Sequence, residues 1–118
     1  DSDTSFLEAV LARGDRRMGK VLEAAWRRGA KLDAWEEYFS LERWLEAFDE
    51  CGVDPHFYAN RSREYGELMP WSMISSGVTE NYLWRERQRG FDAVTTPDCR
   101  THCNGCGANL LVGGKCDV

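Results

Sequence analysis

The stretch Asp15-Arg16-Arg17-Met18-Gly19-Lys20-Val21-Leu22-Glu23-Ala24-Ala25-Trp26-Arg27-Arg28-Gly29 decides the fold of this 118-residue chain. Its apolar residues recur at positions i, i+3, i+4, i+7 and i+8, a spacing that places them on one face of an α-helix. They are Met18, Val21, Leu22, Ala25 and Trp26. Asp15 can cap the amino end of this helix, and Gly29 can end it. The pattern predicts an amphipathic helix whose apolar face packs against other parts of the chain.

Two capping boxes predict further short helices on either side of this stretch. Ser5 and Glu8 form the first box in front of an apolar run, and Gly14 can supply a left-handed stop after it. Asp33 and Glu36 form the second box, which predicts a short helical turn through residue 39.

Three more helices are indicated by single capping residues. Ser40 can cap a helix that ends at Gly52. Asp54 can cap a helix of one or two turns that has proline at its first position. Thr79 can cap a last helix, which we expect to end at Gly90.

Together these signals predict an all-α protein of one domain, because no run of four or more residues shows the alternation of a strand. We expect about five short helices in a compact bundle within residues 1–90, with an ordered connector over residues 61–77. Residues 91–118 should form an irregular, cysteine-rich tail packed on the helices. Most tryptophans fall at core-facing positions, which favours burial over base stacking. They are Trp26, Trp35, Trp44, Trp71 and Trp84.

The cysteines are the strongest chemical signal in the chain. Four of the five lie in the last twenty residues, as Cys99-x3-Cys103-x2-Cys106 followed by Cys116. Thiolates at this spacing can converge on one ion, so the sequence predicts a metal site with these four ligands. Zinc would join the tail to the helices, and a 4Fe-4S cluster is the alternative. His102 competes with Cys116 as the fourth ligand, although adjacent residues seldom reach one ion together.

The spacing from Cys99 to Cys106 is also that of the three cysteines of radical S-adenosylmethionine (SAM) enzymes. In those enzymes an aromatic residue usually precedes the third cysteine, whereas Gly105 takes that place here. Only 12 residues follow Cys106 in the chain of 118, which is too few for a catalytic barrel. The chain by itself is therefore not expected to cleave SAM.

The charge balance disfavours nucleic acid as a partner. The net charge is −5 and the pI is near 5.0, whereas phosphate contact normally requires clustered Lys and Arg. The turn over residues 13–17 invites an anion-binding interpretation, or contact of a zinc module with nucleic acid. We favour the alternative in which Asp15 caps the helix and the arginines form ion pairs. We expect His56 to be packed or exposed rather than catalytic.

An odd number of cysteines with a tight cluster suits an intracellular reducing compartment, either the cytoplasm or an organelle matrix or stroma. No apolar run approaches about 18 residues, so membrane insertion is not expected. The sequence shows no signal peptide or transit segment, and its start at Asp1 suggests a trimmed or internal fragment.

Several strings of the sequence match one known family. They are Ala12-Arg13-Gly14-Asp15-Arg16-Arg17 with Gly19-Lys20, Cys51-Gly52-Val53-Asp54-Pro55 with Phe57-Tyr58, Met69-Pro70-Trp71, Ser76-Gly77-Val78, and Thr96-Pro97-Asp98-Cys99. Together they resemble the C-terminal part of large radical SAM proteins that carry a cobalamin-binding-like domain. The resemblance runs from about Phe6 to Cys106.

In that family this region follows the catalytic barrel, so the resemblance implies an accessory helical segment without the reactive centre. The family's cysteine run tends to finish soon after the Cys-Gly pair, whereas this chain has Asn109 there and Cys116 later, which leaves the fourth ligand open.

We therefore expect a non-catalytic accessory or docking module that binds one metal ion through its tail. Its partner would be a larger protein, a multisubunit assembly or the rest of the same polypeptide. The alternative is a part of a radical SAM enzyme in which the tail holds an auxiliary iron–sulfur cluster.

Overall fold

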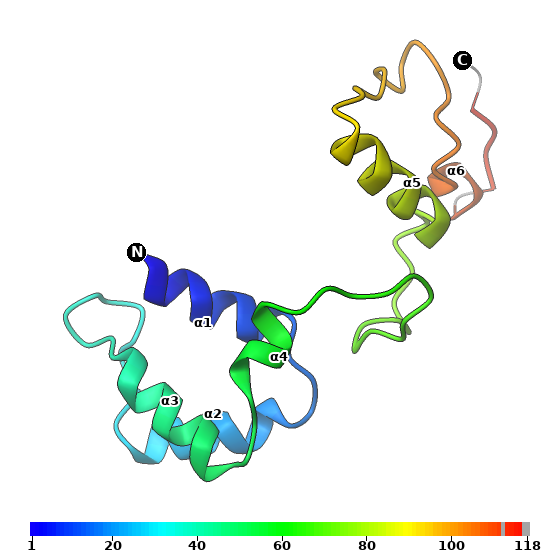
Figure 1. Cartoon of the computed structure of the whole chain (residues 1–118). Helices are drawn as coiled ribbons and strands as arrows, with labels where there is room; N and C mark the ends of the chain where they lie inside the picture. Colours follow the sequence, from blue (N-terminus) through cyan, green and yellow to red (C-terminus); the bar gives the residue numbers. More distant parts are fainter. Residues whose placement is uncertain (112, 117–118) are drawn as a thin grey trace. The chain divides into compact units, whose positions relative to one another are not determined.

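The computed structural model describes residues 1–111 and 113–116, which are helical and contain no strand. The all-α prediction is therefore confirmed for the described part of the chain. The chain divides into two compact units, Asp1–Arg63 and Glu64–Val118, called here the N-terminal unit and the C-terminal unit (Figure 1). No helix among the described residues is long and apolar enough to cross a membrane.

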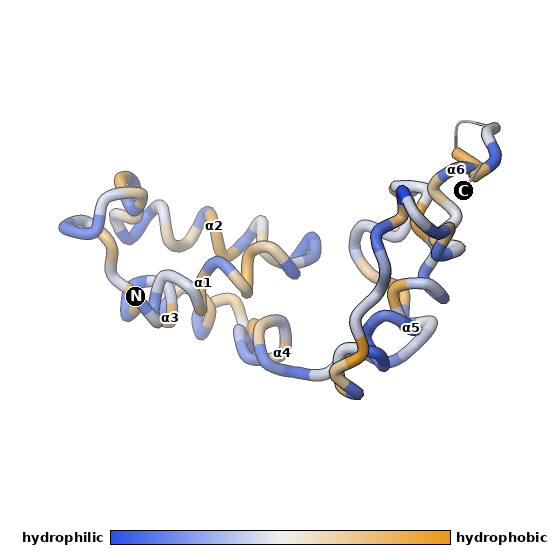
Figure 2. The backbone as a smooth tube through the Cα atoms, turned by 90° about the horizontal axis from the view of Figure 1, so that it is seen from above, coloured by the Kyte–Doolittle hydropathy of each residue, from blue (hydrophilic) through white to orange (hydrophobic). Residues whose placement is uncertain are grey.

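The N-terminal unit contains four helices and the whole buried core. They are α1 (Ser2–Ala12), α2 (Met18–Arg27), α3 (Leu41–Glu50) and α4 (Pro55–Ala59). Helix α2 packs on α3, while α1 packs on α4 and more lightly on α3. Hydrophobic positions recur along α2 and α3 between hydrophilic ones, as amphipathic helices require (Figure 2). Phe48, Val10 and Val21 are the largest fully buried side chains of the core.

The amphipathic pattern of residues 15–29 predicted α2 and its end correctly. Met18, Val21 and Ala25 are buried in the core, and Gly29 has a φ of 101°. The N–H of Gly29 donates to the carbonyl of Trp26, and the next residue reaches back to Ala25, which closes the helix in a Schellman motif. The apolar face is wider than the core, because Leu22 and Trp26 remain about half exposed.

Asp15 does not cap α2, contrary to expectation. The helix begins at Met18, and Arg17 occupies the N-cap position without a side-chain cap. The Asp15 carboxylate accepts instead the N–H of Arg17 (2.9 Å), three bonds from its guanidinium, and the hydroxyl of Tyr58 (3.1 Å). The carboxylate thus joins the α1–α2 turn to α4.

The predicted start of the first helix is wrong, whereas the helix does end just before Gly14, although without the expected left-handed conformation. Helix α1 begins earlier, because the Asp1 carboxylate accepts the N–H of Asp3 (3.1 Å) and makes Asp1 the cap in place of Ser5. Gly14 is not left-handed. A Cβ on Gly14 would lie 2.3 Å from Cγ of Met18, so this glycine is required for close packing.

Residues 30–39 form turns rather than the predicted helical turn. The Asp33 carboxylate accepts the indole N–H of Trp44 (2.6 Å) and is therefore engaged away from a cap. The next two predicted caps are confirmed. Ser40 accepts the N–H of Arg43 (3.4 Å) at the start of α3, and Asp54 accepts the N–H of His56 (2.9 Å) at the start of α4. Gly52, with a φ of 62°, follows the end of α3 as expected.

The C-terminal unit contains α5 (Glu80–Phe91) and the short α6 (Ala108–Leu111). The Thr79 cap is confirmed, because the Thr79 hydroxyl oxygen accepts the N–H of Tyr82 (3.2 Å). The predicted stop at Gly90 is wrong, because the helix runs through it and ends where Ala93 adopts a φ of 53°.

The chain passes from the first unit to the second between Arg63 and Glu64. The sequence favoured a boundary after residue 90. Helix α5 belongs with the residues from Cys99 to Cys116, called here the cysteine segment, because the two are joined by hydrogen bonds. The N–H of Thr79 donates to the carbonyl of Cys106 (2.9 Å), and the Arg85 guanidinium donates to the carbonyl of Asn104 (2.6 Å).

The expectation that most tryptophans are buried is wrong, since among the five only Trp44 belongs to the core. The reason is the distribution of apolar residues between the units. The C-terminal unit has no buried residue among residues 64–111 and 113–116, so Trp71 stays exposed and Trp84 is half-buried against Tyr65.

The close contact at Gly14 leads to a first prediction. Gly14→Ala should destabilise the chain by about 1–3 kcal/mol, because the added methyl overpacks against Met18. Gly19→Ala is the matched control, since a Cβ there meets nothing within 4 Å. Urea unfolding followed by circular dichroism measures both. An equal effect of the two changes would contradict the packing role of Gly14.

The Asp15 carboxylate leads to a prediction on pH. The hydrogen bonds from Arg17 lower the pKa of Asp15 from 3.8 to about 2, so its stabilisation is present above pH 4 and lost as the pH falls through about 2. Asp15→Asn should cost about 1 kcal/mol at pH 7, since the side chain is 30% exposed. The cost should largely vanish at pH 2 in urea unfolding. A cost independent of pH would contradict the ionic origin.

Candidate metal centre

Cys106 is the predicted ligand that the structure anchors most firmly. Its carbonyl accepts the N–H of Thr79 (2.9 Å), immediately before α5, and its sulfur accepts the N–H of Ala108 (3.5 Å) at the start of α6. The first bond holds the chain at Cys106 against the amino end of α5, and the second fixes the turn that leads into α6.

Gly107 makes this close approach possible. It has a φ of 92°, and a Cβ on it would lie 2.7 Å from Cγ2 of Thr79 and 3.1 Å from the carbonyl oxygen of Gly77. Gly77 in turn has a φ of 82° and faces Ala108 and Leu111 of α6. Two glycines in left-handed conformations therefore let the two backbones pack against each other.

Cys103 receives hydrogen bonds in the same manner. The pKa of the Cys103 thiol is lowered, chiefly by a hydrogen bond from the Cys116 thiol and further by the backbone N–H of Gly105. Cys103 and Cys106 thus each accept the N–H of the residue two positions later. Such bonds favour the thiolate, which is the form that binds a metal ion.

Cys116 lies close to Cys103. Its pKa is raised by its hydrogen bond to Cys103, by burial, and by repulsion from the thiolates of Cys103, Cys106 and Cys99. Cys116 is therefore within electrostatic range of the other three predicted ligands. Cys103 and Cys106 are half-buried, whereas Cys99 and Cys116 are exposed.

His102, the alternative fourth ligand, is exposed, and its backbone N–H joins the turn that follows Asp98 (3.3 Å to the Asp98 carbonyl). Cys51 belongs to the other unit and takes no part. Within residues 1–111 and 113–116, no three His, Cys, Asp or Glu side chains are arranged so that they could hold a metal ion. The sulfurs of a zinc site lie about 3.8 Å apart, given Zn–S bonds of about 2.3 Å, so the thiols must move together to form one.

In the turn over residues 13–17, two of the three arginines, Arg13 and Arg17, are engaged with other parts of the N-terminal unit and are therefore poor anion ligands. The Arg17 guanidinium is paired with Asp15 and lies over the rings of Phe57 (5.6 Å) and Tyr58 (5.4 Å). Arg13 donates to the carbonyl of Ala59 (3.1 Å). These contacts favour the structural interpretation, in which the arginines hold the turn against α4.

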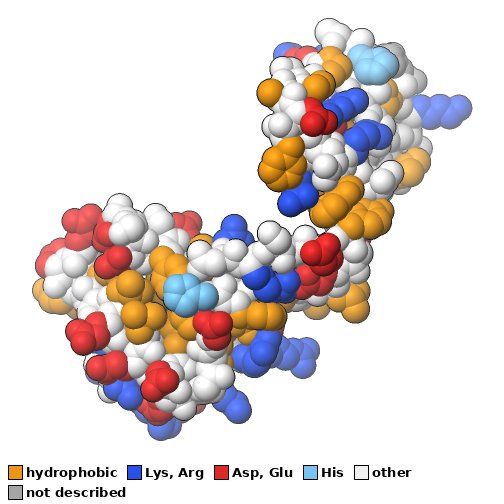
Figure 3. Space-filling model, in the orientation of Figure 1, with side chains coloured by type: hydrophobic (Ala, Val, Ile, Leu, Met, Phe, Trp, Pro, Cys, Tyr) orange, Lys and Arg blue, Asp and Glu red, His pale blue; other side chains and the backbone are white. Residues whose placement is uncertain are grey.

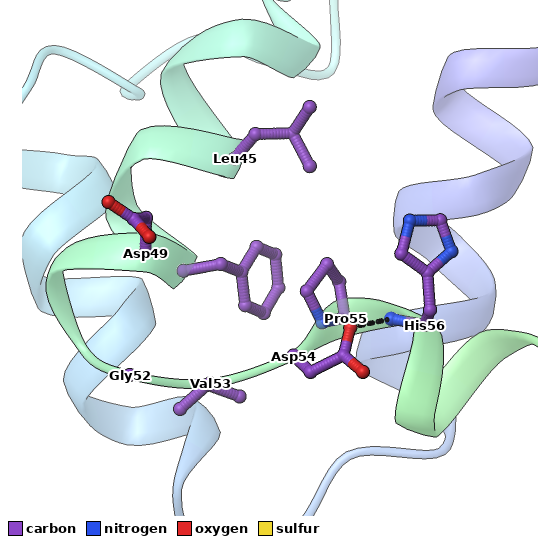
Figure 4. Close-up of a pocket in the computed structure, with 8 residues that line it drawn as sticks. Leu45, Asp49, Gly52, Val53, Asp54, Pro55 and His56 are labelled. Atoms are coloured by element: carbon purple, nitrogen blue, oxygen red, sulfur yellow. Dashed lines mark hydrogen bonds between the residues drawn. The ribbon is translucent and has the colours of Figure 1, made fainter.

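His56 is exposed, and its ring packs on Phe6, as the sequence led us to expect of a non-catalytic histidine. Its ring lies 5.0 Å from that of Phe6 and its Nδ1 lies 2.9 Å from Oδ1 of Asn60. The histidine borders a hollow of about 460 Å³ that sequence reasoning missed (Figure 4). The hollow arises where helices pack together, so no local sequence motif predicts it.

A larger hollow, of about 610 Å³, lies in the C-terminal unit between residues 66–78 and the start of α5. It is lined by apolar residues and serines, with Glu67 and Glu80 at its border. Three neighbouring apolar side chains are among the most exposed in the chain: Leu68 at 87%, Met73 at 79% and Ile74 at 74%. The predicted connector is ordered, but its apolar anchors largely face solvent.

Comparison with known proteins gave no relative: no family model matches the chain, and no curated protein or solved structure matches it.

Gly107 supplies a test of the anchoring geometry. Gly107→Ala should weaken the bond between the Thr79 N–H and the Cys106 carbonyl, because the new methyl meets Thr79 at 2.7 Å. Amide hydrogen exchange of Thr79 should accelerate at least about tenfold. Gly113→Ala is the control, since Gly113 also has a positive φ but a Cβ there meets nothing within 4 Å. Unchanged exchange in Gly107→Ala would show that the two segments are not held together this way.

Proposed function

We propose that this chain is a non-catalytic docking module that binds a larger protein through the apolar surface of its C-terminal unit, and that its cysteine segment binds one metal ion. The observation that carries the proposal is the exposure of Leu68, Met73 and Ile74 in a unit without a buried residue in its described part.

The two units differ in how much apolar surface they bury. Folding is driven mainly by apolar surface removed from water, at about 25 cal/mol per Å². The N-terminal unit has such a core, whereas the C-terminal unit leaves its large apolar side chains in solvent. A unit of this kind gains stability by covering those side chains with a partner, by binding a metal, or by both.

The cysteine segment supports the metal part of the proposal. The N–H of Ala108 donates to the sulfur of Cys106 (3.5 Å), and hydrogen bonds from the Cys116 thiol and the Gly105 N–H lower the pKa of Cys103. Hydrogen bonds from backbone N–H groups to a thiolate orient it as a ligand and stabilise its charge. Four thiolates form a closed tetrahedral set, which suits structural zinc. Zinc would hold the segment on α5 through Cys106.

The larger partner would be the remainder of a radical SAM polypeptide or a multisubunit assembly. The basis for this part of the proposal is the set of sequence strings that resemble the C-terminal region of those proteins. In that setting the module would carry no reactive centre of its own.

Metal binding is tested by purifying the chain anaerobically and measuring its zinc, iron and sulfide content. We expect about one zinc per chain, and Cys103→Ser should reduce zinc affinity by at least about tenfold because it removes a thiolate. Cys51→Ser, in the other unit, should bind zinc normally. A brown protein that contains iron and sulfide would show that the site holds an auxiliary iron–sulfur cluster instead of zinc. A protein without any metal would refute the metal part of the proposal.

Docking is tested through the exposed apolar side chains. The isolated chain should bind a hydrophobic fluorescent dye, and the double change Leu68→Ser with Ile74→Ser should remove most of that signal without loss of helix. Leu32→Ser, which changes one half-exposed residue of the N-terminal unit, is the control. A monodisperse monomer that binds no dye would contradict the docking role.

A further inference from the structure

Helix α3 separates two hollows on the surface of the N-terminal unit. The first, of about 410 Å³, lies between α1 and α3 and has an apolar lining that includes Leu7, Leu11 and Trp44. The second, of about 460 Å³, lies between α3 and α4 and is lined by Leu45 and Pro55, among others (Figure 4). Consecutive residues of α3, Trp44 and Leu45, therefore line one hollow each.

Both hollows are lined by carboxylates. Glu8 and Asp33 line the first, Asp49 and Asp54 line the second together with His56, and neither lining includes a lysine or arginine. Asp33 accepts the indole N–H of Trp44 and pairs with Arg43 (3.5 Å), and Asp54 accepts the His56 N–H. The carboxylates of Glu8 and Asp49 make no hydrogen bond or ion pair within the described residues.

The surface between these acids is apolar. Leu45 is 40% exposed, and Figure 4 shows its side chain and the Pro55 ring at the hollow, with the Asp49 carboxylate at the border. On the face of the N-terminal unit drawn in Figure 3, hydrophobic side chains gather among Asp and Glu side chains. An apolar surface with a negative border suits a ligand of the opposite charge around an apolar centre.

We propose that this face binds an amphipathic helix of a partner protein whose apolar side chains are flanked by lysine or arginine. A helix that crosses α3 can place one apolar side chain in each hollow, as helix-in-groove recognition requires. Its cations would then lie beside Glu8 and Asp49, whose charges are available. A second copy of this chain paired through the same face is a poorer occupant, because the pairing would set the carboxylates of the two copies against each other. This interface is independent of the docking surface in the C-terminal unit.

The probe is a synthetic helical peptide of about 15 residues with leucines on one face and lysines beside them. Its binding to the full chain is followed by fluorescence anisotropy at low salt. A second peptide replaces every lysine by glutamate. We expect saturable binding of the lysine peptide, weakened by salt, and no binding of the glutamate peptide.

Three variants of the protein locate the interface. Leu45→Ser should weaken binding at least about tenfold, because it removes part of the apolar floor. Glu8→Gln with Asp49→Asn should do the same by removing both available charges. Glu36→Gln with Glu37→Gln changes the net charge equally at exposed positions outside both hollows and should stay within about twofold of the original affinity.

Several results would overturn the proposal. They are a lack of saturable binding, equal binding of the two peptides, or equal losses in the two charge variants, which would indicate only general attraction. Self-association that Leu45→Ser abolishes would identify a second copy as the occupant instead. If Leu45→Ser loses its helix content, the charge variants alone decide.

Discussion

The burial of Phe48 with Val10 and Val21 is the constraint on which the folded part of this protein depends. These three side chains come from α3, α1 and α2, and they are the largest fully buried ones in the core. Each helix has ten or eleven residues, a length at which isolated helices are marginal in water. The shared core therefore stabilises all three, and α4 joins through the buried Tyr58, whose hydroxyl reaches Asp15.

The described part of the C-terminal unit lacks such a core and depends on a few hydrogen bonds between α5 and the cysteine segment. Its cysteine segment is placed by backbone contacts at Cys106 and by two glycines that allow close approach. Backbone bonds of this kind contribute only about 1 kcal/mol each when water can compete. These bonds alone therefore stabilise the unit only weakly. Covering the exposed apolar residues with a partner surface and binding a metal ion to the cysteines are the two ways in which its chemistry could add stability.

The two apolar surfaces differ in character. The hollows beside α3 lie on a unit with its own core and carry a border of carboxylates. The surface around Leu68 and Ile74 belongs to a unit without a described buried residue. The first favours reversible binding of a charged segment, whereas the second favours a permanent contact that contributes to folding.

Local patterns in the amino-acid sequence were enough to predict α2, the caps Ser40, Asp54 and Thr79, and the glycines that follow α2 and α3. Each depends on residues within one helical turn, so nearest-neighbour chemistry decides it. Tertiary contacts decided the rest. Asp15 does not cap α2 because its carboxylate is bonded to Arg17 and Tyr58. The Asp33 carboxylate likewise accepts the indole N–H of Trp44 in place of a cap. Periodicity identifies an apolar face but cannot say whether another element covers it, which is why Trp26 and Trp71 are exposed and Trp44 is buried. The grouping of α5 with the cysteine segment, and the hollows beside α3, likewise arise from residues far apart in the chain, whose meeting only the folded structure determines.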